Sequence, residues 1–228
     1  LRLGRGYTMN ATRMAALGLL ATLPLVAWAG VNIDHIESAT SSFDLVNEDI
    51  RIGANSTVKD LQTVNGEIEL GDGSRAGGVE TVNGGIELGA RVRVDDAETV
   101  NGDITAGEDL VVKEDLETVN GDIRVGASAS IGEDVRTVNG AIALDKAVVK
   151  GEVVITAGSI NTGSGSKIGA IRVEDSNGNS DGKKRKPVVM VGPNTTVGPV
   201  TFEREGELRV HRTATVGEVT GVKATVFD

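Results

Sequence analysis

The four-residue word T-V-N-G occurs five times in this 228-residue chain, starting at Thr63, Thr81, Thr99, Thr118 and Thr137. These starting positions are almost evenly spaced along the chain. An isoleucine follows each glycine by two places, and the same step extends this column to seven positions: Ile50, Ile68, Ile86, Ile104, Ile123, Ile142 and Ile160. A fixed period of about 20 residues, rich in glycine and β-branched residues, is typical of a solenoid.

Each repeat contains three short apolar segments, and no helical periodicity follows the N-terminal region. One repeat alone cannot bury its apolar face, so successive repeats must stack. We therefore predict an all-β protein: a parallel β-solenoid, or β-helix, with three short strands in each coil of about 18–19 residues. The general preference for right-handed parallel crossovers favours a right-handed coil.

Asn-Gly is also a strong signal for a two-residue β-hairpin, so an antiparallel meander or sandwich is the alternative fold. A series of such hairpins would expose Val100, Val119 and Val138. A meander also has no need for the same residues at every turn. Both arguments favour the solenoid.

Stacked coils lie about 4.8 Å apart and place each sequence position above itself. Because an asparagine amide has both a donor and an acceptor, the repeated asparagines can bond to one another along the stack. We predict a structural ladder of Asn65, Asn83, Asn101, Asn120 and Asn139. We expect the following glycine to supply a positive φ at a corner, the valine before each asparagine to face the core, and the threonine to lie on the strand surface.

The N-terminal region has the pattern of a secretory signal peptide. After Met9 come Arg13, an apolar run over residues 14–26, and Ala27-Trp28-Ala29 as a cleavage site before Gly30. The run is shorter than the roughly 20 apolar residues that a membrane-spanning helix needs. We therefore expect export, and no transmembrane segment after cleavage.

These patterns divide the chain into five parts. We assign upstream residues and signal peptide to 1–29, an N-terminal cap to 30–43, the main β-solenoid to 44–173, a charged projecting loop to 174–187, and a short C-terminal solenoid block to 188–228. The last block either continues the main stack or forms a separate unit. Phe43 and Phe227 either plug the ends of the core or are ordinary edge residues.

The composition after the leader restricts both the core and the partners. Without cysteine the chain has no disulfide, and its remaining aromatic residues are Phe43, Phe202 and Phe227, so Val, Ile and Leu must form the core. The 20 basic and 33 acidic residues after position 29 argue against nucleic acid as a partner. The basic run Lys183, Lys184, Arg185 and Lys186 is a candidate contact for an anionic partner, or alternatively a solvated loop.

We expect no enzymatic activity, and we predict no catalytic residue, cofactor site or metal site. His35 and His211 are the only histidines, and no nucleophile elbow, phosphate loop or metal-ligand spacing is present. The acidic column after the corner glycine is interrupted at Gly85 and Ala141, which indicates a solvated face. A polysaccharide-active enzyme stays open as an alternative because paired carboxylates occur at Asp95-Asp96, Glu108-Asp109 and Glu114-Asp115.

Through the words T-V-N-G-D-I, T-V-N-G-E-I and T-V-G-P-V, residues 44–226 resemble two bacterial groups. One is an adhesin-type β-solenoid family with recurrent V-N-G-D-I words, and the other comprises the bactofilin-like, polymer-forming proteins. The first resemblance, together with the leader, implies a non-enzymatic exported protein of the periplasm or cell surface, a structural or adhesive element of the envelope. The second implies a filament-forming scaffold that associates through the solenoid ends, although its members are typically cytoplasmic. An envelope component or a second copy is the expected partner.

Overall fold

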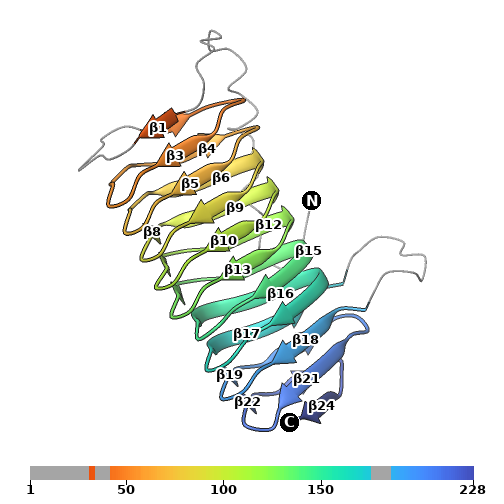
Figure 1. The fold of residues 1–228 in the computed structure, drawn as a ribbon. Helices are drawn as coiled ribbons and strands as arrows, with labels where there is room; N and C mark the ends of the chain where they lie inside the picture. The colour runs from red at the N-terminus through yellow and green to blue at the C-terminus, as the bar shows by residue number, and fades with distance from the viewer. Residues whose placement is uncertain (1–30, 34–41, 176–185) are drawn as a thin grey trace.

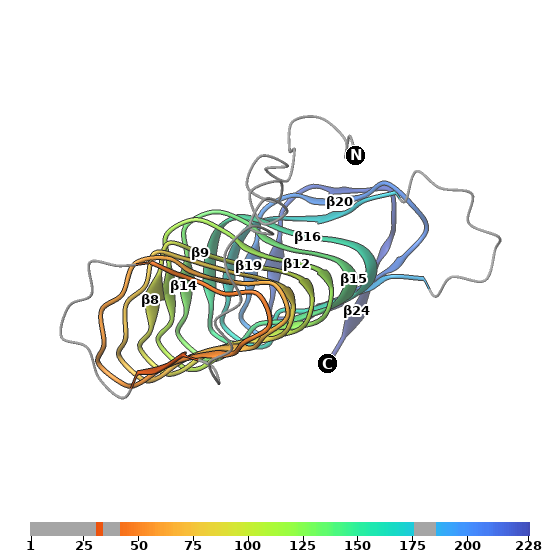
Figure 2. The same cartoon turned by 90° about the horizontal axis from the view of Figure 1, so that it is seen from above.

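The computed structural model describes residues 31–33, 42–175 and 186–228, with the backbone alone for the first range. In these ranges the chain contains no helix and forms one parallel β-solenoid of about 10 coils (Figure 1). Seen down the stack, successive coils follow one another as similar closed loops (Figure 2). The predicted all-β parallel solenoid is therefore confirmed, and the antiparallel meander is excluded because the described strands pair in parallel. The right-handed sense of the coil stays a prediction.

Three ranks of strands form the sides of the stack, and we name each rank by its residues. The isoleucine face contains β1 (Val31–Ile33), β3 (Ile50–Ile52), β5 (Ile68–Leu70), β7 (Ile86–Leu88), β10 (Ile104–Ala106), β13 (Ile123–Val125), the ends of β15 (Val135–Ala143) and β16 (Val148–Asn161), β18 (Val188–Val191), β21 (Glu207–His211) and β24 (Ala224–Phe227). The short-strand face contains β8 (Arg93–Val94), β11 (Val111–Val112), β14 (Ser130–Ile131), the starts of β16 and β17 (Lys167–Val173), β19 (Thr196–Val197) and β22 (Thr215–Val216). The threonine face contains β2 (Phe43–Asp44), β4 (Leu61–Thr63), β6 (Gly78–Asn83), β9 (Asp96–Asn101), β12 (Leu116–Asn120), the start of β15, the middle of β16, the end of β17, β20 (Val200–Phe202) and β23 (Val219–Thr220).

The predicted register holds along the whole isoleucine column. Each member pairs with the next, from Ile50 and Ile68 to Ile142 and Ile160. The chain after residue 187 continues the same stack, since Ile160 pairs with Val189. The C-terminal block is thus an extension of the main solenoid.

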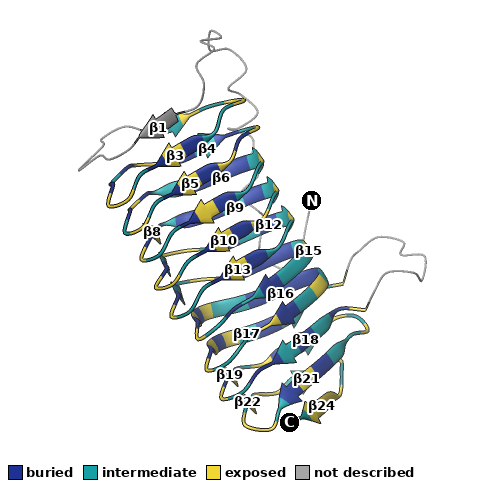
Figure 3. Cartoon of the chain, in the orientation of Figure 1, coloured by how far each residue is buried: buried dark blue, intermediate teal, exposed yellow. Residues whose placement is uncertain are grey.

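The core is a narrow column of aliphatic side chains. Inward positions of the strands are buried and alternate with exposed ones (Figure 3). Phe43 pairs with Leu61 and packs against this core, as a plug would. Phe227 lies outside it, edge-on to His211 with ring centroids 5.3 Å apart, so it is an edge residue and not a plug.

The expected orientations of threonine and valine in T-V-N-G are wrong. The five threonines are at most 3% exposed, whereas the valines that follow them are partly exposed. Strand alternation explains this difference: Leu61 faces the core, so Thr63 two positions later does as well. Each threonine hydroxyl is satisfied inside by a carbonyl of the preceding coil; for example, Thr99 Oγ1 donates to Gly84 O at 2.9 Å. Valine exposure therefore does not distinguish a solenoid from a hairpin, whereas the parallel register does.

The expected reason for the corner glycine is wrong as well. Among the described residues, positive φ values do not occur at Gly66, Gly84, Gly102, Gly121 or Gly140. These positions require glycine because adjacent coils approach closely: a Cβ at Gly84 would lie 1.9 Å from Gly66 O. A left-handed residue recurs instead at the corner before the short-strand face, where the column is Asn55, Gly73, Arg91, Asp109, Ser128, Lys146, Gly165 and Asn194.

Candidate functional site

The five repeated asparagines form one hydrogen-bonded ladder where the strands of the threonine face end. Asn101 Nδ2 donates to Asn83 Oδ1 at 2.9 Å, and Asn120 Nδ2 donates to Asn101 Oδ1 at 2.9 Å. The same contact links the other members, and the ladder reaches one coil further, to Asn47. It ends at Ala157, which takes the column position after Asn139. Side-chain amides do not titrate, so this rank contributes hydrogen bonds and no acid–base chemistry.

The acidic column next to this ladder has a structural function that sequence reasoning missed. Asp103 Oδ1 accepts the backbone N–H of Asp122 at 2.8 Å, and Asp122 Oδ1 accepts that of Ala141 at 2.7 Å. The backbone N–H of Asp122 is the main cause that lowers the pKa of Asp103, and Arg124 also contributes. These carboxylates therefore satisfy corner amides of the following coil, whereas the sequence indicated only a solvated face.

A second carboxylate column lies where the chain enters the threonine face. Asp60 Oδ1 accepts the N–H of Gly78 at 3.0 Å, and Asp134 Oδ1 accepts the N–H of Glu152 at 2.7 Å. Asp115 likewise accepts the N–H of Asp134 at 2.7 Å. This column also pairs side-chain acceptors with backbone donors between coils.

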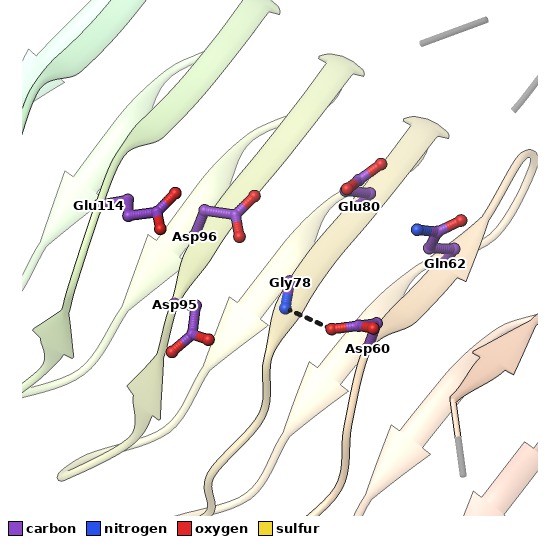
Figure 4. A pocket seen from close by; sticks show the side chains of 7 residues that line it. All are labelled: Asp60, Gln62, Gly78, Glu80, Asp95, Asp96 and Glu114. Carbon is purple, nitrogen blue, oxygen red and sulfur yellow. Dashed lines mark hydrogen bonds between the residues drawn. The ribbon is translucent and has the colours of Figure 1, made fainter. Parts of the chain in front are cut away.

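A shallow depression of about 260 Å³ opens beside this column (Figure 4). Gly78 has no side chain to fill it: a Cβ there would lie 3.2 Å from Asp96 Oδ1. The depression is predominantly acidic and is lined by Asp60, Gln62, Gly78, Glu80, Asp95, Asp96 and Glu114.

Residues from two of the three carboxylate pairs on which the enzyme alternative is based line the depression. Asp95-Asp96 and Glu114 line it, whereas Glu108-Asp109 lies at the opposite end of the short-strand face, before β11. Asp95 forms an ion pair with the exposed Lys113. Among the described residues, no group of three or more His, Cys, Asp or Glu side chains is arranged to hold a metal ion.

A buried ion-pair cluster lies next along the same face. Arg136 is 6% exposed, and its guanidinium contacts Glu117 at 3.1 Å, Asp134 at 3.2 Å and Glu174 at 3.5 Å. Burial raises the pKa of Glu117, and the charge of Arg136 acts in the opposite direction. Burial is also the main cause that raises the pKa of Asp115. The offset between Glu117 and Arg136 was a readable signal for this cluster, because it equals the coil period.

Of the four residues predicted as a basic contact, the structure describes one. Lys183, Lys184 and Arg185 lie outside the described residues, as do the signal peptide and His35. Lys186 is exposed and forms an ion pair with Glu205 at 3.1 Å. The described part of the chain has no apolar helix of membrane-spanning length.

Comparison with known protein families, with curated proteins and with solved structures finds no match for this chain.

Proposed function

We propose that this chain is a non-enzymatic, exported β-solenoid that serves as a structural or adhesive element of the bacterial cell envelope, in the periplasm or on the cell surface. The main observation behind the proposal is that the repeated polar side chains form hydrogen bonds from one coil to the next. The asparagines bond to one another, and the columns of Asp103 and Asp60 accept backbone N–H groups of the next coil. Side chains that are committed to joining coils suit a long, stiff scaffold better than a reaction centre.

Continuity of the stack supports the same proposal. About 10 coils at ~4.8 Å each make a rod of about 50 Å, in which parallel strand pairing links each coil to the next. A rod of this kind displays a long, repetitive surface to an extended partner.

Export and envelope binding are tested together. The full chain is expressed in a bacterium, the cells are fractionated, and the N-terminus of the product is determined by mass spectrometry. We expect a product that begins at Gly30, lies in the periplasm or on the surface, and is retained on isolated envelope material. An unprocessed cytoplasmic product would contradict the proposal. Turnover in a panel of polysaccharides that is lost in Asp96→Asn would instead support the enzyme alternative.

A filament-forming scaffold is the second candidate, and the last coil favours it. Within the described residues, β22, β23 and β24 each pair on one side only. Val226, which continues the inward column of Val210, is 67% exposed. Unpaired strand edges with an exposed apolar residue are templates for further pairing.

Two neighbouring substitutions separate this candidate from nonspecific association. Val226→Lys places a charge over the core column, whereas Thr225→Lys places the same charge on the outward side of the same strand. Filaments built on this end should be weakened by the first change and kept by the second, as read by sedimentation and electron microscopy. Equal behaviour of both variants would remove the filament candidate.

A further inference from the structure

Two arginines lie in register on adjacent coils of the short-strand face. Arg75 and Arg93 form a parallel β-bridge, and both side chains point outward and are exposed. Their backbones are fixed by coil-to-coil hydrogen bonds: Arg75 N donates to Ser56 O at 2.8 Å, and Arg93 N donates to Ser74 O at 2.9 Å. The two side chains therefore leave the surface about 4.8 Å apart, one above the other.

These two arginines differ from every other arginine in the described ranges. Neither forms an ion pair or a side-chain hydrogen bond with a described residue. The others each have at least one such contact: Arg51, Arg91, Arg124, Arg136, Arg172, Arg204, Arg209 and Arg212.

Like charges directly opposite each other on neighbouring strands are unfavourable. Elsewhere arginines contact carboxylates of the preceding coil, as in Arg124 with Asp103 at 2.8 Å and Arg172 with Glu152 at 2.6 Å. Glutamates also lie in register, as Glu69 and Glu87 do, so the arginine pair is set apart by its lack of a described partner. At the arginine pair the same rank continues with neutral residues on both sides, Thr57 below and Val111 above. Two stacked, unpaired guanidinium groups in an otherwise acidic chain indicate an anion that is supplied from outside.

We propose that Arg75 and Arg93 form a binding site for the anionic groups of an extended acidic polysaccharide that lies along the solenoid axis. This inference rests on the proposed adhesive function and names the partner class. A guanidinium presents paired N–H donors to carboxylate, sulfate or phosphate oxygens, and two of them at the coil spacing hold one such group between them or two in succession. Arg91 flanks the pair from the preceding corner, with Asp72 at 3.5 Å from its own guanidinium.

The surrounding charges favour a narrow polymer over a broad anionic surface. Beyond the next corner lie the exposed carboxylates Asp60 and Glu114, and Asp109 is exposed on the other side. A flat anionic membrane or a nucleic acid duplex would bring its charge close to these groups and be repelled. A single extended glycan chain contacts the arginine rank and avoids them.

The test uses residues 30–228 and measures binding of polygalacturonate by biolayer interferometry at low salt. We expect the affinity for polygalacturonate to fall as the salt concentration rises. The double variant Arg75→Gln/Arg93→Gln should lower this affinity about tenfold or more. The matched control is Arg51→Gln/Arg124→Gln, which removes the same charge from arginines of the isoleucine face that already have acidic partners. Neutral dextran should not bind. Equal affinity of both double variants, or no binding of polygalacturonate by the wild type, would overturn the proposal.

Arg75→Glu gives a second readout that loss of folding cannot mimic. It places a carboxylate in register with Arg93, so the melting temperature should rise while polygalacturonate binding is lost. Loss of binding with a lowered melting temperature would point to damage of the fold and would overturn the argument from like-charge stacking. Stronger binding to anionic vesicles or DNA than to polygalacturonate, abolished by the same variants, would replace the proposed partner class.

The two proposals can fail separately. A cytoplasmic, unprocessed chain whose arginine pair still binds polygalacturonate would contradict the envelope function and leave the arginine site intact. An exported chain that is retained on envelope material through other residues would contradict the arginine site and leave the envelope function intact.

Discussion

Because neighbouring coils approach closely at Gly84 but not at Gly85, we expect alanine at these two adjacent positions to have opposite effects on stability. Gly84→Ala introduces a Cβ 1.9 Å from Gly66 O and 2.6 Å from Gly66 C. Gly85→Ala introduces the same methyl group at the next position, where the nearest atom is Asp103 O at 3.4 Å, an ordinary contact. The column of Gly85 already contains an alanine, Ala141.

The magnitude follows from the distance that the coils would have to move. A carbon and a carbonyl oxygen prefer a separation near ~3.3 Å, so the Gly84 methyl requires a displacement above ~1 Å. Hydrogen bonds on both sides oppose it, among them Asn83 N to Val64 O at 2.8 Å. Overpacking of this kind costs about 3 kcal/mol or more. Gly85→Ala should be neutral or stabilise by about 0.4–1 kcal/mol, because it restricts only the unfolded chain.

Thermal unfolding followed by circular dichroism provides the assay. For a chain of this size, a loss of about 3 kcal/mol lowers the melting temperature by roughly 6–12 °C. We expect a fall of this size for Gly84→Ala, and a melting temperature at or above that of the wild type for Gly85→Ala. A Gly84→Ala variant as stable as Gly85→Ala would refute the close approach of the coils.

Three further predictions concern the ladder, the left-handed corner and acid stability. Asn101→Ala breaks two ladder bonds and should cost about 1 kcal/mol in urea unfolding, whereas the exposed Thr105→Ala should cost little. Ser128→Gly should stabilise by about 0.5–1 kcal/mol because φ there is 66°, and Ser130→Gly in a strand should destabilise. The lowered pKa of Asp103 stabilises the fold above the ordinary value of 3.8, and this contribution is lost as pH falls through the folded pKa. Asp103→Asn should therefore be less stable than the wild type at pH 7, and melting scans should converge as pH falls below about 4.

The features that sequence alone predicted are those that depend on the period. A position that recurs once in every repeat lies above its counterpart once the coils stack, so the register of Ile50 to Ile160 and the asparagine ladder both follow from spacing. The orientation of Thr63 was also within reach, because counting alternate positions from Leu61 places its side chain inside. The same count places the valine between Thr63 and Asn65 on the outside, contrary to the expectation that it faces the core.

The features that sequence did not predict depend on distances between coils. The clash at Gly84 and the bond from Asp103 to the next coil require the position of a neighbouring backbone atom, which spacing does not supply. The contacts between charged residues were predictable only in part. Glu117 with Arg136, and Arg75 with Arg93, occupy shared columns and are visible as offsets, but whether each has a partner depends on where the side chains reach.

The coils differ in length, yet the isoleucine column continues through all of them. The coil from Ile86 to Ile104 has the ordinary length, whereas the coil from Ile160 to Val189 is considerably longer, and both pairs occupy the same column. The difference in length lies between Val173 and Val188, and the strands before and after these residues stay paired with the neighbouring coils. Such a scaffold is open to modular growth: copying one coil lengthens the rod, and lengthening one corner adds a new surface feature, with neither change requiring the neighbouring coils to be rebuilt.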